Sequence, residues 1–420
     1  MVLFVALLFT VLVLIVTYVH NSIKRPSTYP PGIIFSNGED WKIRRRFTLR
    51  NLRDFGFGKS SMDDLILEEL KQLAKILNPS NDPAGRLVEL DGSLNAAVTN
   101  VIWWIAASKR VDNENPEFQD ILETISEFIL PFDMSKLLTF LPSWRPFVPG
   151  FLIRQEDRLK RREKIYSYMQ GLIDEHRRTV DPSEPRDLID CYIIEEKRLK
   201  DAGKDSSTFQ DDSVAWSLAD IFIAGAETTS TTLRWFFLYM VVYPKIQSRI
   251  QEEIDNVVGK DRLPNSEDRV RMPYTEAVLW EIWRHKTIVP LGVDRRASKD
   301  VEFAGYQIPK GTIMTTMIYA IHHDPDNFEH PEVFNPDRFL TESGQLIKNP
   351  KIMPFQAGRR QCLGENLARL NAFLGVVYLL QVFRFEKEPG HEYTLESKPR
   401  TEGINVPMPY KCRIIPRNVH

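Results

Sequence analysis

The sequence feature that most constrains this chain is a cysteine in a loop bracketed by glycines. Residues 355–364 read Phe-Gln-Ala-Gly-Arg-Arg-Gln-Cys-Leu-Gly, and a helix-forming run begins at Glu365. Glycine at 358 can adopt a positive φ, and glycine at 364 lets the backbone approach something flat and bulky. Cys362 stands just before the helix, where unpaired N–H groups and the helix dipole favour a thiolate. A lone cysteine is usually a small buried hydrophobe, but this frame favours a metal ligand.

The fixed positions of this loop carry a family resemblance. They are Phe355, Gly358, Arg360, Cys362 and Gly364, and they match the haem-binding loop of the cytochromes P450, F-x-x-G-x-R-x-C-x-G. The resemblance implies that the cysteine thiolate ligates the iron of haem b. It also implies that the arginine binds a haem propionate.

The first nineteen residues are apolar and contain no charged side chain. At about 1.5 Å per residue they would span roughly 28 Å, close to the apolar thickness of a bilayer. The basic start and small-residue cleavage site of a signal peptide are missing. Lys24 and Arg25 follow and place the rest of the chain on the cytoplasmic side. We expect a transmembrane anchor at 1–20, a proline-rich hinge at 21–32 and a catalytic domain at 33–420.

Directly after the hinge, Trp41 and Arg45 are four residues apart and share one helix face. This stretch resembles the start of the C helix of P450s, which implies that both residues hold a haem propionate. The alternative is a core tryptophan beside a solvated basic face. In the family, the first helices and first strands lie between the hinge and this helix. The resemblance therefore implies an N-terminally incomplete haem domain that lacks the A–B region.

Apolar spacing predicts four further helices before residue 200, at Asp63–Leu77, Leu94–Ala107, Phe118–Ile129 and Arg154–His176. The apolar, proline-broken stretch Leu141–Ile153 lies between two of them. It resembles the family's loop between the F and G helices, which dips into the membrane. A buried connector is an equally good interpretation.

A long apolar helix is predicted over Asp211–Val242, interrupted by Ala224-Gly-Ala-Glu-Thr-Thr. Glycine and threonine are poor helix formers, and threonine hydroxyls can bond back to a carbonyl and bend the helix. We therefore expect a locally opened helix. The stretch resembles the acid–threonine motif of P450s, which implies that Thr228 handles oxygen and Glu227 delivers protons. Alone, such a run could simply cap or bend a helix.

Glu281 and Arg284 are three residues apart on one predicted helix face and can pair. The E-x-x-R pair and the segment Phe334-Asn-Pro-Asp-Arg-Phe resemble the buried structural triad of P450s. Arg338 is then its third member. The resemblance implies that the triad holds the loop that carries Cys362.

Two short β regions are expected after this helix. Thr287–Val293 is an apolar run typical of a strand, and Val301–Thr316 has turns at Gly305 and Gly311. By resemblance, Arg295 binds a propionate and Thr401–Met408 forms a turn at the substrate.

Composition bounds the partners of this protein. A net charge of −2 gives no sign of a basic surface for nucleic acid, and three cysteines are too few for a disulfide framework. No flavin or nicotinamide motif appears, so electrons must come from another protein. The resemblance implies NADPH–cytochrome P450 reductase, with cytochrome b5 as a second candidate. Lys351, Arg359 and the arginines of 44–53 are the expected basic docking residues.

The resemblance thus implies a mainly α fold with small β-sheets, anchored in the endoplasmic reticulum membrane. The implied activity is haem-thiolate monooxygenation of a lipophilic molecule, such as a steroid, isoprenoid, fatty acid or xenobiotic, with O2. One alternative is a catalytically inactive truncated isoform. A reductase-independent haem-thiolate isomerase ranks lower, because such relatives often lack the acid–threonine pair.

Overall fold

The computed structural model describes residues 32–55, 61–78, 82–110, 115–129, 148, 155–399 and 403–417. The described chain is mostly helical with three small sheets, as predicted. The expected anchor, nearly all of the hinge, and all of Leu141–Ile153 except Val148 lie outside these residues. Among the described helices, none is both long enough and apolar enough to cross a bilayer.

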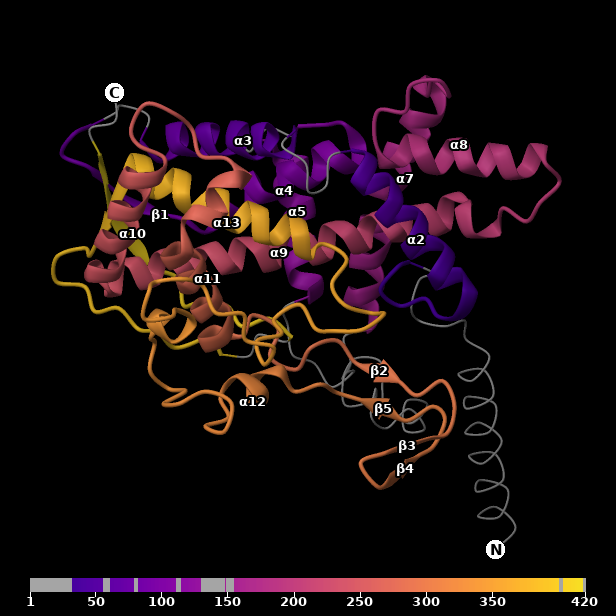
Figure 1. Ribbon diagram of the computed structural model, residues 1–420. Helices are drawn as coiled ribbons and strands as arrows, with labels where there is room; N and C mark the ends of the chain where they lie inside the picture. Colours follow the sequence, from indigo (N-terminus) through magenta and orange to yellow (C-terminus); the bar gives the residue numbers. More distant parts are fainter. Residues whose placement is uncertain are drawn as a thin grey trace, which may run out of the picture.

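Most of the described residues lie in helices (Figure 1), and the longest stretches between described helices precede the last two of them. The helices are α2 (Gly38–Asp54), α3 (Ser61–Leu77), α4 (Asp91–Ala107), α5 (Pro116–Ile129), α7 (Gln155–Thr179), α8 (Leu188–Asp201), α9 (Asp211–Val242), α10 (Pro244–Val257), α11 (Pro273–Lys286), α12 (Ile318–His322) and α13 (Glu365–Val382). Short 3₁₀ turns lie at Ser207–Phe209, Ser266–Arg271 and Pro336–Phe339. The four helices expected before residue 200 are all present as α3, α4, α5 and α7.

Helix α9 runs through the middle of the helical body (Figure 1) and contacts α4, α7, α11 and α13. Its apolar side chains are buried nearly all round, which is the pattern of a helix inside a large core. Acidic residues in its first turn complement the positive end of the helix dipole. Pro244 at the start of α10 stops it, because proline cannot continue the hydrogen-bond ladder.

The strands form two groups at opposite ends of the molecule (Figure 1). One group is the antiparallel sheet β1 (Arg86–Glu89), β7 (Lys411–Pro416) and β6 (Phe383–Glu386), in the order β1-β7-β6. The other contains the pair β2 (Arg295–Arg296) and β5 (Ile313–Met314) and the hairpin β3 (Val301–Phe303) and β4 (Tyr306–Ile308). The strands predicted within Val301–Thr316 are therefore present.

The strand predicted at Thr287–Val293 is wrong. Thr287 ends α11 in the left-handed conformation with φ of 36°, and the chain then turns. Pro290 has no N–H to offer a sheet, and Gly292 closes the turn at φ of 66°. The apolar character of this run instead reflects its packing, because Ile288 and Val289 contact the main core.

Candidate functional site

The loop around Cys362, residues 355–364 (the cysteine loop), is folded by its own backbone. The N–H of Cys362 donates to the carbonyl of Phe355 at 2.9 Å, and Gly358 has φ of 80°. Gly364 is the N-cap of α13. No atom lies within 4 Å of a Cβ built at Gly358 or Gly364, so space is open beside both glycines.

Burial and two nearby groups act on the Cys362 thiol in opposite directions. Desolvation raises the pKa of this thiol, whereas the backbone N–H of Gly364 and the charge of Arg45 lower it. Cys362 is nevertheless exposed. Its side chain is thus accessible to solvent but has protein on most sides, as expected for a residue on the wall of a hollow.

Three arginines gather around this loop, and we call them the arginine cluster. Arg45 of α2 donates to the carbonyl of Gln361 at 2.7 Å. Arg295 of β2 donates to the carbonyl of Arg360 at 3.1 Å and to the side chain of Gln356. Arg360 itself donates to the carbonyls of residues 33, 34 and 36 at 3.4, 3.3 and 2.5 Å. Residues far apart in the sequence thus surround the cysteine.

No carboxylate forms an ion pair with any member of the arginine cluster within the described parts of the chain, and Asp294 acts on Arg295 only as a nearby charge. The bonds from Arg45 and Arg295 to the cysteine loop go to carbonyl or amide oxygens. Desolvation, together with the charges of Arg295 and Arg45, lowers the pKa of Arg360 to about 10. Desolvation also lowers the pKa of Arg45 and of Arg295. Three crowded cations without an anion are typical of a site for an anionic ligand.

Trp41 lies beside this cluster. The Arg360 guanidinium stacks 3.9 Å from its ring centroid, and Arg45 lies 6.0 Å away. Its indole is nearly buried, at 9% exposure. The structure therefore brings together all four residues that were predicted to hold propionates: Trp41, Arg45, Arg295 and Arg360.

One neighbouring arginine does not behave as expected. Arg44 was placed on the basic docking face, but it is buried at 3% exposure. Its guanidinium donates to the hydroxyl of Ser213 at 3.1 Å. It shares a helix with exposed arginines but points inward, because α2 packs one face against the body of the protein.

Most of helix α9 is buried, but near its middle one face is accessible to solvent; we call this face the accessible stripe. Ile221, Ala224, Gly225 and Thr228 are not buried, and their spacing of three and four places them on one face. Helix α9 is also linked to the arginine cluster. Asp220 accepts from the N–H of Ile34 at 2.7 Å, and Arg360 bonds the carbonyl of the same residue. An accessible stripe on a central helix is where a bound group would pack.

The acid–threonine pair lies on α9 without the predicted helix opening, because the helix is continuous from Asp211 to Val242. The Thr228 hydroxyl donates to the carbonyl of Ala224 at 2.8 Å, a bond that leaves the α-helical ladder intact. The prediction of a locally opened helix is therefore not borne out in this structure.

Glu227 is buried and its carboxylate points toward α4. It accepts from the amide of Asn95 at 3.2 Å and lies 3.7 Å from the Arg234 guanidinium. Arg234 in turn pairs with Asp91 at 2.8 Å. The sequence reasoning missed these partners, because Asn95 lies 132 residues earlier and no local pattern signals the contact.

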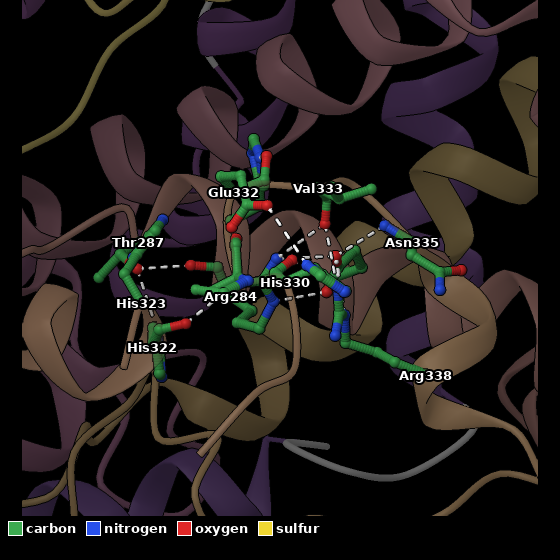
Figure 2. A network of polar contacts seen from close by, with 12 residues as sticks. Arg284, Thr287, His322, His323, His330, Glu332, Val333, Asn335 and Arg338 are labelled. Atoms are coloured by element: carbon green, nitrogen blue, oxygen red, sulfur yellow. Dashed lines mark hydrogen bonds and ion pairs between the residues drawn. The ribbon is translucent and has the colours of Figure 1, made fainter. Parts of the chain in front are cut away.

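Glu281, Arg284 and Arg338 (the triad) make the expected contacts, and Figure 2 labels the two arginines. Arg284 pairs with Glu281 through two hydrogen bonds of 2.7 and 2.8 Å. Nε of Arg338 lies 3.1 Å from the same carboxylate. The side chains of Glu281 and Arg284 are completely buried. The remaining N–H groups of both arginines donate to main-chain carbonyls, including those of residues 322, 329 and 331. Every charge here has a partner.

These residues fit the haem that the resemblance implies. Haem is a flat macrocycle with two carboxylates. Its site therefore needs a thiol for the iron, cations that are not already paired with a carboxylate, and accessible apolar surface. The arginine cluster has no carboxylate of its own, and Cys362 lies in the loop between its members. The open space at Gly358 and Gly364 would admit a flat group. The described residues thus offer each kind of donor that haem b requires.

Comparisons with known proteins agree with this geometry. The family described as "Cytochrome P450" matches residues 17–412. Human "Cytochrome P450 2J2" is 37% identical over 389 residues, which cover 92% of this chain and 75% of the human protein. Rabbit (Oryctolagus cuniculus) "Cytochrome P450 2B4" is 37% identical over 92% of this chain and 77% of its own length. A spiny lobster (Panulirus argus) protein, "Cytochrome P450 2L1", is 36% identical over 91% of this chain.

Members of this family bind haem b through a cysteine thiolate. The match covers nearly the whole chain, including both motif-bearing helices and the cysteine loop. The chain belongs to the cytochrome P450 family and is a haem-containing monooxygenase of the animal microsomal type.

Proposed function

We propose that this protein inserts one atom of O2 into a lipophilic small molecule and reduces the other to water, with electrons from NADPH–cytochrome P450 reductase. The overall reaction is R–H + O2 + 2e⁻ + 2H⁺ → R–OH + H2O. The observation that carries this proposal is the arginine cluster around the cysteine loop, which has no carboxylate of its own. It supports a bound dianionic cofactor at Cys362.

Haem, when bound, would supply the activation of O2, which no side chain can perform. Cys362 would ligate its iron. Arg45, Arg295, Arg360 and Trp41 would hold the propionates. For this, the arginines would keep or exchange some of their present bonds to carbonyl oxygens.

The roles of Thr228 and Glu227 follow from their positions on α9. The Thr228 hydroxyl lies on the accessible stripe and has one hydrogen bond that it could exchange. Glu227 would have to rotate away from Asn95 and Arg234 to pass a proton to that stripe. We infer that Thr228 orients oxygen and water at the site, while Glu227 connects the site to a buried proton source.

A basic groove supports the choice of electron donor. Its volume is about 830 Å³, and its cationic lining comes almost entirely from α2: Lys42, Arg45, Arg46, Arg50, Arg53 and Arg359. Only one acidic residue, Asp54, lies among its lining residues. An acidic partner would associate faster with such a surface, so reductase is the proposed occupant and cytochrome b5 a second one.

The location of the protein is also proposed from its sequence and its relatives. Residues 1–20 would form a single anchor in the endoplasmic reticulum membrane, followed by a hinge at 21–32. The catalytic domain, 33–420, would then face the cytoplasm beside the reductase. A lipophilic substrate suits the apolar residues Ile221 and Ala224 on the accessible stripe.

Turnover with purified reductase tests this function. The full chain in lipid vesicles is given NADPH, O2 and a panel of steroids, fatty acids and xenobiotics. We expect NADPH-dependent oxygenated product from at least one of them. Thr228→Ala should keep consuming NADPH while product per NADPH falls about tenfold or more, the scale of a lost proton-transfer group.

Thr232→Ala is the matched control for this test. Thr232 lies one turn further along α9, and its hydroxyl makes the same kind of bond, to the carbonyl of Thr228 at 3.0 Å. Its coupling should stay at the wild-type value. Haem-loaded wild-type protein that forms no product with any substrate would contradict the proposed activity and favour an inactive isoform.

A further inference from the structure

One buried histidine joins the triad to the chain that leads into the cysteine loop. His322 is the last residue of α12 and is completely buried. Figure 2 shows it at the edge of the network, next to Thr287 and Arg284, and it is hydrogen-bonded to both. No sequence motif discussed above assigns it a role.

Both ring nitrogens of His322 are hydrogen-bonded. Nδ1 lies 2.9 Å from the hydroxyl of Thr287. Nε2 lies 3.0 Å from the main-chain nitrogen of Met353, nine residues before Cys362. The carbonyl of His322 meanwhile accepts from Arg284 at 2.9 Å. A single residue therefore touches the triad, the end of α11 and the approach to the cysteine loop.

The partners fix the tautomer of this ring. The N–H of Met353 can only donate, so Nε2 must be unprotonated. The Thr287 hydroxyl donates to the carbonyl of Arg284 at 2.7 Å, so its oxygen is free to accept from Nδ1–H. Both ends of the ring thus require the neutral form with the proton on Nδ1. Burial lowers the pKa of His322 to about 3, which keeps the ring neutral near pH 7.

The bond to Met353 acts at the start of the cysteine loop. The carbonyl of Met353 accepts from the N–H of Gln356 at 3.0 Å, and the carbonyl of Phe355 accepts from the N–H of Cys362. Phe355 packs edge-on against Trp283 of α11, with ring centroids 5.5 Å apart. Two contacts therefore hold the start of the cysteine loop: the hydrogen bond from Met353 to His322, and the packing of Phe355 against Trp283 of α11.

We propose that His322 is a positioning residue that transmits the rigidity of the triad to the cysteine loop through the N–H of Met353. This inference rests on the proposed role of Cys362 as the iron ligand. The triad itself makes no contact with Cys362 among the described residues. His322 supplies a polar connection, because it bonds Arg284 on one side and the backbone at Met353, two residues before the cysteine loop, on the other.

Hydrogen exchange in the full chain tests this connection directly. In His322→Leu the Met353 amide loses its acceptor, and we expect exchange in peptides covering 353–362 to become about tenfold faster or more. Peptides from β6 and β7 should change far less. His322→Gln places an amide oxygen near the position of Nε2, so it should restore protection and the red-shifted Soret band of the reduced, CO-bound protein.

Two further variants serve as controls. Thr287→Val keeps the side-chain shape but removes the acceptor for Nδ1, so it should loosen the same peptides to a smaller degree. His323→Gln changes the adjacent histidine, whose Nδ1 lies 3.0 Å from the carbonyl of Tyr319 and not beside Met353, and should leave these peptides unchanged.

Two results would overturn the proposal. One is unchanged exchange over 353–362 in His322→Leu, and the other is an equal increase over the whole chain. Cys362→Ser separates this inference from the proposed function. If that variant kept the thiolate spectrum, the ligand assignment would fail, whereas the exchange result would still decide the role of His322.

Discussion

Two groups of arginines lie near the cysteine loop, and they are built in opposite ways. In the triad, Arg284 and Arg338 share one buried carboxylate, and their remaining donors reach carbonyl oxygens. In the arginine cluster, desolvation lowers the pKa of all three guanidinium groups, and repulsion from Arg45 adds to this at Arg295 and Arg360. No described carboxylate forms an ion pair with any of them.

This difference separates a structural element from a binding site. A buried ion pair with all its hydrogen bonds made is complete, and nothing further needs to bind there. A group of like charges in a partly desolvated place is stable only at a cost, which an anion would remove. The triad is therefore expected to hold the protein together with or without haem. The arginine cluster is expected to matter chiefly when haem is present.

The largest effect is expected from Glu281→Gln. This change leaves two buried cations without their counter-charge and should lower the free energy of unfolding by about 3–5 kcal/mol. Urea unfolding of the haem-free protein measures it. A loss below about 1 kcal/mol would mean that the triad is not the structural element described here.

Lowering the pH should destabilise the protein through His322, the histidine beside the triad. The pKa of His322 is about 3 in the folded protein, against an ordinary value of 6.5, because burial disfavours the charged ring. The unfolded chain therefore takes up a proton below about pH 6.5 that the folded chain refuses, so stability falls as pH falls. Between about pH 7 and pH 5 the part of this loss that comes from His322 should be about 2 kcal/mol.

His322→Gln provides the control for this acid effect. Glutamine does not titrate, so the free energy of unfolding should depend less steeply on pH over the same range. The measurement is a series of urea titrations at fixed pH. A variant with the same pH slope as the wild type would show that other groups carry the acid sensitivity.

Arg45→Met should affect haem binding more than stability. Arg45 makes one hydrogen bond, to the carbonyl of Gln361, and its loss is partly offset by weaker repulsion within the cluster. We expect haem affinity to fall about tenfold to a hundredfold, the scale of a bond to a charged group. The stability of the haem-free protein should change by less than about 1 kcal/mol.

Arg46→Met is the matched control, because Arg46 is exposed on the same helix and is not a member of the arginine cluster. It should retain haem like the wild type when haem loss to an excess of apomyoglobin is followed. If both variants lost haem equally, the cluster would have no special role. If Arg45→Met instead unfolded the protein, the comparison with the triad would be wrong.

The smallest effect is expected from Arg249→Ala. Arg249 pairs with Asp337, next to the triad residue Arg338, but the two side chains are 48% and 56% exposed. Exposed pairs contribute about 0–1 kcal/mol, so urea unfolding should detect little change. A loss similar to that of Glu281→Gln would show that burial is not what distinguishes the triad.

The sequence predicted the helices well because their apolar spacing is strong. The fixed spacing of the motif residues named the candidate members of the site, and the structure places Trp41, Arg45, Arg295 and Arg360 close together. The sequence did not predict the sheet formed by β1, β6 and β7, because its strands are short and come from distant parts of the chain. Thr287–Val293 reads as a strand in the sequence because apolar composition alone cannot distinguish a strand from a buried turn.

The remaining misses are contacts between residues far apart. Arg44 was expected at the surface beside other arginines, but its direction depends on how α2 packs. Asn95 and Asp220 touch the site only through tertiary structure. His322 has no motif of its own, and its partner Met353 lies 31 residues away. Local spacing reveals which residues carry chemistry but not which residues hold them in place.

The most direct test of this account is the absorption spectrum of the reduced, CO-bound full chain, compared with that of Cys362→Ser. The account predicts a strongly red-shifted Soret band in the wild type, typical of thiolate-ligated haem, and its loss in the variant. Haem bound without that band in the wild type would contradict the account. So would a band that survives the substitution, because Cys362 could not then be the ligand.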